Sequence, residues 1–238
     1  MKQITTKADA KIENSELSDA FLIFQNARLS SISLYQAFEL ARAKRGKPGG
    51  MTTDLEQDIL RAMLVMACAG LDSALKQVIR DALPQLVQTN PEAQAGLEKF
   101  VERQIRGEDI DIGTNVKYLA RVLASTSPHR RVVESYIADL TGDSLQSANQ
   151  LFKAVNVLGV DSKEVGVNKP RLQPIFEARN QIIHELDIDL DGERRKRNIR
   201  SMGLMIEWTD CILELTKAII EAVDKLIQPK KLLRRRRL

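Results

Sequence analysis

The chain has 238 residues, long for one domain but enough to bury a substantial core without disulfides or metals. Its two cysteines, Cys68 and Cys211, lie far apart within apolar helical patterns, which is typical of small core residues in a reducing compartment and excludes a disulfide framework or a zinc site. The formal net charge is +4, but residues 228–238 hold six cations and no acid, so the remainder carries −2 and the basic character is local.

The start of the chain carries no targeting signal that we can identify. Residues 1–14 are polar and contain no apolar signal core. We find no apolar run that approaches the ~20 residues needed to span a bilayer. The sequence therefore predicts a soluble, cytoplasmic protein with no membrane partner. We divide it into a flexible segment (1–14), a single helical domain (15–227) and a basic tail (228–238).

The first two predicted helices have clear boundaries. Apolar residues recur at helical spacing from Leu17 to Ala41, and the glycines and proline of residues 46–50 end this pattern. Thr52 or Thr53 then caps a long second helix, with Glu56 as the capping-box partner of Thr53. Pro84 is expected to end or kink this helix. Its predicted buried stripe is Ile59, Met63, Ala67, Leu71, Ala74, Val78 and Ala82.

Residues 84–142 contain additional helices beyond a minimal bundle. Three short amphipathic patterns follow one another. They carry Leu97, Phe100, Val101 and Ile105; then Val116, Leu119, Ala120 and Leu123; then, after Ser127-Pro128, Val132, Val133, Tyr136, Ile137 and Leu140. Asp143 or Ser144 is predicted to cap the next helix, and residues 159–169 form a loop.

Two further helices complete the domain. Pro170 suits the first turn of one, and the other is predicted from about Arg194 to Ile227. The spacing of the last helix favours near-antiparallel packing in a bundle. Its predicted stripe is Leu204, Trp208, Cys211, Leu215, Ala218 and Ala222. Only residues 187–191 alternate like a strand, so we predict an all-α, up-and-down helical bundle with additional helices inserted in the middle of the chain.

The most informative residues are Arg179, Asn180 and His184, which form the pattern Arg-Asn-x-x-x-His. The chain has only two histidines, so His184 is one of the few groups able to transfer a proton near neutral pH. Asn180 and His184 lie ~40° apart on a helix, whereas Arg179 lies ~140° from His184 and ~7.5 Å away along the axis. Only a side chain as long as arginine can bring a charge to the same phosphate.

This pattern, on the penultimate helix of an all-α bundle, resembles the motif of the HEPN superfamily. The apolar Leu172, Ile175 and Phe176 before it, and the acidic stretch after it, are also similar to bacterial members. The resemblance covers about residues 52–227. It implies a metal-independent endoribonuclease without cofactors, acting as a homodimer through the motif helix. Many bacterial members are toxins or antiphage defence factors, so an antitoxin or inhibitor protein is a possible partner.

The chemistry of RNA cleavage agrees with these residue types. Attack by the 2′-hydroxyl needs a base and an acid, which two copies of His184 would supply in a dimer. Arg179 would stabilise charge on the phosphate, and Asn180 would orient the phosphate or the imidazole. The product would carry a 2′,3′-cyclic phosphate. The alternative is a non-catalytic dimerisation or binding module for a protein partner or RNA.

Two basic clusters are candidate RNA-binding segments. The first comprises Arg194, Arg195, Lys196 and Arg197, with Arg200 nearby, and the second is the tail. Each is equally consistent with a solvated surface, and no helix-turn-helix pattern supports a regulator that uses the tail. His129, in Ser127-Pro128-His129, is predicted to be exposed.

Asp187-x-Asp189-x-Asp191 resembles the start of a calcium loop, but Asn198 stands where the bidentate glutamate is required, so no metal site is predicted.

Overall fold

The computed structural model describes residues 15–46, 50–106, 112–190 and 195–228, and within them the chain is all-α, as predicted. Its only strand-like feature in these ranges is a single antiparallel bridge between Ile188 and Arg197. A 3-10 turn (Ser15–Leu17) precedes eight α-helices: α1 (Ser18–Lys44), α2 (Asp54–Thr89), α3 (Pro91–Arg106), α4 (Ile112–Leu123), α5 (Pro128–Gly142), α6 (Ala148–Val157), α7 (Lys169–Glu185) and α8 (Met202–Ile227).

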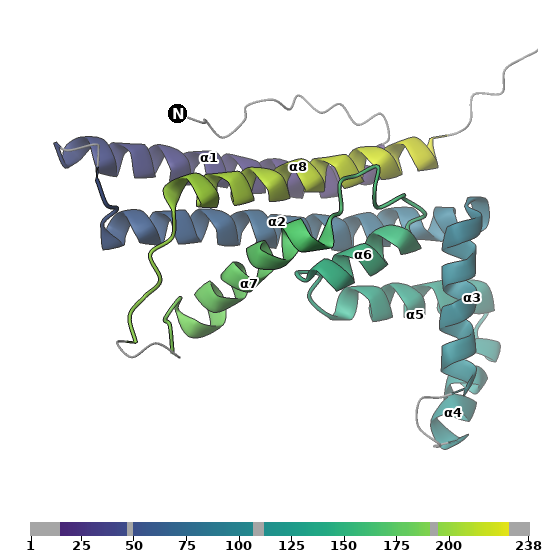
Figure 1. Ribbon diagram of the computed structural model, residues 1–238. Coiled ribbons are helices and arrows are strands. Elements are labelled where there is room, and N and C mark those ends of the chain that lie inside the picture. Colours follow the sequence, from purple (N-terminus) through teal and green to yellow (C-terminus); the bar gives the residue numbers. More distant parts are fainter. Residues whose placement is uncertain (1–14, 47–49, 107–111, 191–194, 229–238) are drawn as a thin grey trace, which may run out of the picture.

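Helix α2 is the centre of the molecule and contacts α1, α3, α5, α7 and α8. Helices α1, α2 and α8 run side by side along the long axis (Figure 1). The Gln57 amide donates to the Arg200 carbonyl at one end, and the Gln85 amide donates to the Ile227 carbonyl at the other. Helix α8 is therefore parallel to α2, and its predicted antiparallel packing applies only to α1.

The composition of α2 follows from this central position. Its predicted stripe is buried except for the half-buried Ile59, and a second row that includes Leu60, Leu64 and Leu75 is buried as well. The sequence analysis missed that α2 is, by length and composition alone, apolar enough to cross a membrane, with a mean hydropathy of 1.4 over its most apolar window. Packing against α1 and α8 accounts for this apolarity.

The helix ends were predicted with mixed success. The Thr53–Glu56 capping box is present, with both reciprocal hydrogen bonds. Helix α2 does not end at Pro84 but continues to Thr89, and the buried Leu83 and Leu86 on either side of the proline keep the helix packed in the core. Helix α6 is capped by Ser147 rather than by Asp143 or Ser144.

Helix α8 begins at Met202 rather than near Arg194. Residues 195–201 are irregular because their polar groups bond to α2 and to the end of α7. The predicted stripe is correct at Cys211 and Leu215, which are buried, whereas Leu204 is exposed and Trp208, Ala218 and Ala222 are half-buried. The deepest row is displaced from it and comprises Met205, Ile212, Ile219 and Val223.

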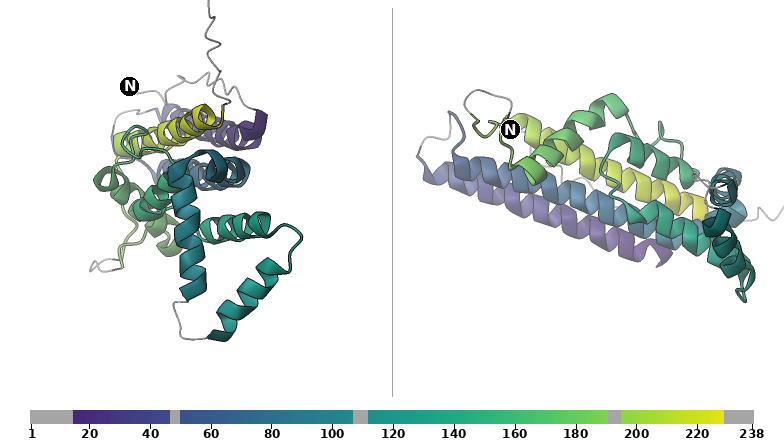
Figure 2. Two further views of the ribbon diagram at one scale, coloured as in Figure 1. Left: turned by 90° about the vertical axis from the view of Figure 1, so that its right-hand side faces the viewer. Right: turned by 90° about the horizontal axis from the view of Figure 1, so that it is seen from below.

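The additional helices form an arm at the end of α2. Helix α3 crosses this end and extends away from the bundle to α4, from which α5 returns towards α2 (Figures 1 and 2). Phe100 and Tyr136 are buried between α3 and α5, as predicted. The predicted core face of α4 is wrong, because Val116 and Leu123 are exposed. The terminal segments 1–14 and 229–238, and the breaker residues 47–49, lie outside the described residues.

Candidate functional site

Helix α7 presents the motif at the surface beside the start of α2. Its first turn is capped by the Asn168 side chain, which accepts from the Arg171 backbone N–H at 3.2 Å, and Pro170 follows the cap. Leu172, Ile175 and Phe176 are buried and fix the rotation of the helix. The opposite side therefore faces solvent, and the motif lies in the last two turns.

The structure brings two of the three motif side chains into contact. Asn180 and His184 are exposed on the same face of α7, and Arg179 is half-buried. The Arg179 guanidinium donates to Asn180 Oδ1 at 2.9 Å. Among the described residues, no hydrogen bond or ion pair joins His184 to either of them. The imidazole is thus accessible, and a phosphate between Arg179 and His184 would need the guanidinium to turn towards the helix end.

The Arg179 guanidinium group is partly buried. Its Nε is buried and has no hydrogen-bond partner in the described part of the chain. Burial raises the pKa of the Cys68 thiol to about 12, and the nearby positive charge of Arg179 opposes this rise. Cys68 and Cys211 are both buried free thiols, as predicted. Arg179 therefore keeps an unused donor next to the motif face.

The end of α7 is held by a buried carboxylate. Asp187 follows the helix with a positive φ of 59°, after Leu186 at 51°, and its side chain is fully buried. Arg61 Nε of α2 lies 2.7 Å from one carboxylate oxygen, and Arg200 lies 2.5 Å from the other. Burial favours the neutral acid, but hydrogen bonds from Arg200 and Arg61 outweigh this effect, so the pKa of Asp187 lies below its usual 3.8.

The same arginines connect this carboxylate to the motif helix. Arg200 also donates to Gln181 Oε1 at 2.7 Å, one residue after Asn180 in the chain. Arg61 also donates to the Asn198 carbonyl at 2.7 Å. We call Arg61, Gln181, Asp187, Asn198 and Arg200 the anchor network. It fixes the last turn of α7 and the segment after it to α2.

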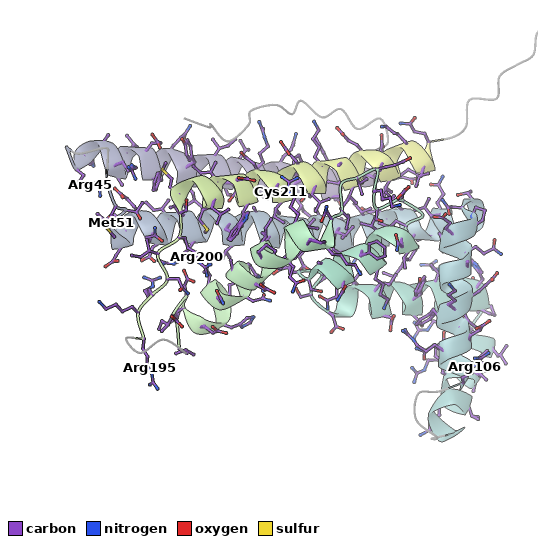
Figure 3. The ribbon with its side chains drawn as sticks, viewed as in Figure 1. Arg45, Met51, Arg106, Arg195, Arg200 and Cys211 are labelled. Carbon is purple, nitrogen blue, oxygen red and sulfur yellow. The ribbon has the colours of Figure 1, made fainter. Side chains whose placement is uncertain are left out.

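The residues of the predicted basic cluster have different environments in the structure. Arg194 lies outside the described residues, and Arg195 and Lys196 are exposed. Arg197 is also exposed but lies 2.6 Å from Asp58, and its hydrogen bond is the main reason why the pKa of Asp58 is lowered. Figure 3 shows Arg195 on the outer part of the segment between α7 and α8 and Arg200 nearer to the helices. The exposed cations of this cluster therefore lie on the same segment that follows His184.

Sequence reasoning did not identify the anchor network. Arg61 stands between Leu60 and Ala62 within an apolar helix, and a lone charge at a buried position was the available signal. Asp187, the first acid of the rejected calcium-loop pattern, instead pairs with Arg200. With this carboxylate occupied by arginines, it is not available as a calcium ligand.

Large apolar side chains surround the motif end of the molecule. Ile183, which directly precedes His184 in the chain, is 40% exposed, and Leu186 is 67% exposed. Further exposed apolar residues lie on the following segment and the start of α8: Leu190, Ile199 and Leu204. Exposed apolar residues gathered in this way are typical of a protein contact.

A further cleft lies away from the motif. It has a volume of about 1250 Å³, lies between α3, α5 and α6, and is lined by Phe100, Tyr136 and Phe152 among others, but by no motif residue.

His129 is exposed in the first turn of α5, as predicted. Within the described ranges, no group of three or more His, Cys, Asp or Glu side chains is placed to hold a metal ion.

No protein-family model, curated protein or solved structure matches this chain. The resemblance to the HEPN superfamily therefore depends on the motif, on its place in the last two turns of α7, and on the chemistry of its side chains.

Proposed function

We propose that this protein is a metal-independent endoribonuclease of the HEPN type, acting on RNA as a homodimer. The observation that carries the proposal is the arrangement at the end of α7. His184 and Asn180 are exposed on one face, and the Arg179 guanidinium bonds to Asn180. The cation, the polar orienting group and the proton-transfer group are thus on two adjacent turns, and the anchor network fixes those turns.

The reaction would proceed by attack of the RNA 2′-hydroxyl on its own phosphate. A neutral His184 would take the hydroxyl proton as the P–O2′ bond forms, and a protonated His184 would give a proton to the departing 5′-oxygen. The products are a 2′,3′-cyclic phosphate and a free 5′-hydroxyl. Arg179 would turn its unused N–H groups towards the phosphate and stabilise the additional negative charge.

A homodimer would supply both histidines to one site. A single chain offers one motif histidine, whereas a two-fold pairing of α7 helices places two of them and two Arg179 side chains about one axis. The exposed Ile183 between Asn180 and His184, and Leu186 after them, support burial of this face by a second copy. From the resemblance, we propose a cytoplasmic toxin or antiphage defence component restrained by an antitoxin or inhibitor protein.

A second candidate is a non-catalytic module that uses the same face to bind a protein partner or RNA. Two observations favour it: the Arg179 charge lies near the buried Cys68, and no hydrogen bond joins Arg179 to His184 among the described residues. In this case the exposed apolar residues would still form an interface, but no cleavage would follow.

Cleavage of a mixed RNA pool in EDTA tests the proposal. We expect the wild-type chain to cut RNA and to leave cyclic phosphate ends, and His184→Ala to lose at least ~100-fold in rate, because removal of a general acid–base has about this cost. His129→Ala is the matched control, since it removes the other histidine of the chain and should cut normally. Equal absence of cleavage by well-folded wild type and His184→Ala would support the binding module instead.

A further inference from the structure

The tip of the arm carries a group of exposed cations. We define the arm tip as residues 112–133, comprising α4, the connection after it and the start of α5. It contains four cations, Lys117, Arg121, Arg130 and Arg131, and no acid. All four are exposed. Residues 1–228 together carry −2, so the tip is a positive end on an acidic body.

Three of these cations surround a hollow. Arg121 of α4 and Arg130 and Arg131 of α5 line a depression of about 390 Å³, together with the hydroxyl residues Ser125, Thr126 and Ser127. One acid, Glu134, also lines it; Arg130 lies 2.9 Å and Arg131 3.6 Å from its carboxylate. One carboxylate therefore faces three guanidinium groups, which leaves an excess of two positive charges at the hollow.

This combination suits a phosphate in an extended polyanion. Guanidinium groups bind phosphate oxygens in a planar, bidentate manner, and hydroxyls add neutral donors. Arg130 is 80% exposed and Arg131 44% exposed, so both can turn from Glu134 to an incoming phosphate at small cost. The excess of positive charge at the hollow also attracts the RNA backbone.

The arm tip and the motif lie at opposite ends of α2. The anchor network joins the motif to α2 at Arg61, whereas the arm begins after Thr89 (Figure 1). The axial distance from Arg61 to Thr89 along the helix is about 40 Å. At ~3.4 Å per nucleotide in a stacked strand, an RNA that follows this length of α2 alone has roughly 12 nucleotides, and an RNA that continues along α3 to the tip is longer.

We propose that the arm tip is a second RNA-binding site, which holds backbone phosphates of a substrate engaged at His184. This inference rests on the proposed function and adds to it a minimum length for RNA that benefits from the second site. An RNA long enough to reach both sites is bound by both, whereas a short RNA is bound without help from the arm. The arm thus selects long RNA substrates by their backbone.

RNA binding by full-length chains carrying His184→Ala tests this proposal without interference from cleavage. Fluorescent single-stranded RNAs of 24 and 6 nucleotides would be titrated at several salt concentrations. The tip variant combines Arg121→Ala, Arg130→Ala and Arg131→Ala. We expect it to bind the 24-mer at least fivefold more weakly, with a salt slope smaller by about two, because each phosphate contact on a single strand contributes ~0.7. Its affinity for the 6-mer should stay unchanged.

The matched control removes three exposed cations elsewhere, through Lys44→Ala, Arg80→Ala and Lys163→Ala, and thus changes the net charge equally. It should bind the 24-mer like the parent. Equal weakening by both variants, or none by the tip variant, would overturn the proposal and leave the ribonuclease assignment intact. A parent chain that binds neither RNA would overturn both. Equally tight binding of a poly-glutamate peptide of similar charge would show a general polyanion surface and overturn the assignment to RNA.

Discussion

Asp187 is a fully buried carboxylate at the end of α7, and two arginines from different parts of the chain surround it. Arg61 of α2 is 6% exposed and Arg200 is 16% exposed, so the three charges are largely removed from water. Such a group is stable only when every member is paired. Loss of the central acid leaves Arg200 without its carboxylate and leaves Arg61 with only the exposed Asp58, 3.0 Å away. The charge on Asp187 therefore matters more than its size.

Asp187→Asn tests the charge alone, because it removes the charge of the side chain and leaves the backbone conformation unchanged. Asparagine tolerates the positive φ at this position, so the substitution should not strain the turn. We expect the free energy of unfolding at pH 7 to fall by about 3 kcal/mol. Urea titration would measure this change, with Glu185→Gln, an exposed acid of the preceding turn, as a control that should stay within about 0.5 kcal/mol.

The same variant has a defined pH dependence. The pKa of Asp187 is lowered in the folded state, so its stabilisation is complete above the unfolded value of 3.8 and is lost as the pH falls through the folded pKa. The difference between wild type and Asp187→Asn should therefore be constant from pH 7 to about 5 and shrink below about 4. A difference that stays constant down to pH 2 would mean that the carboxylate charge is not the cause.

At the level of helices, Gly70 sets the distance between α1 and α2. A Cβ atom placed on Gly70 would lie only 2.2 Å from the Ala27 Cβ, so the two helices meet where neither has a large side chain. Glycine within a helix normally has a cost of about 1 kcal/mol relative to alanine. At position 70 glycine is preferred to alanine, because an added Cβ would clash with the Ala27 Cβ, which is attached directly to the backbone of the other helix.

Gly70→Ala should therefore destabilise the protein by about 1–3 kcal/mol, as overpacked cores do. Gly203→Ala is the matched control. It also adds one methyl group to a helical glycine, but no atom lies within 4 Å of the new Cβ. We expect this control to be neutral or stabilising by up to about 1 kcal/mol. Thermal and urea unfolding would report both, and a stabilising Gly70→Ala would contradict the close approach.

The helices that the sequence predicts well are those whose ends depend on local chemistry. The Thr53–Glu56 box and Pro170 act within one turn, so they identify the starts of α2 and α7 without tertiary information. The start of α8 was wrong because residues 195–201 form hydrogen bonds with α2, far away in the sequence. Pro84 does not end α2, because the buried residues on either side of it, such as Leu83 and Leu86, pack the helix against its neighbours, and this packing cannot be read from the sequence.

The candidate site, too, could be predicted only in part from the sequence. Helical spacing predicts that Asn180 and His184 share a face, and the structure agrees. The direction of Arg179 and the anchor network could not be predicted, since they depend on Cys68 and Arg61 of another helix. The periodicity of apolar residues predicts which face of a helix is buried. The partners of a charged side chain depend on how several helices pack together, which periodicity does not predict.

At the level of the whole molecule, two groups of exposed apolar residues are candidates for a contact between copies of the chain. One is the motif end, where Ile183 and Leu186 accompany His184, and the other is the outer face of α1, where Leu29 and Leu40 are 57% and 65% exposed. Either surface can bury a second copy, but they have different consequences. Only pairing through the motif end brings two histidines into one site.

The proposed dimer predicts which surface matters. Ile183→Gln with Leu186→Asn should shift the protein from dimer to monomer and abolish RNA cleavage, because the site is incomplete in one chain; asparagine suits the positive φ of Leu186. Leu29→Gln with Leu40→Gln removes comparable apolar surface from α1 and should leave both properties unchanged. Sedimentation and the cleavage assay on the same samples would decide. If the α1 variant dissociates and the motif variant stays a dimer, the two His184 side chains do not meet, and one chain would have to supply both proton transfers.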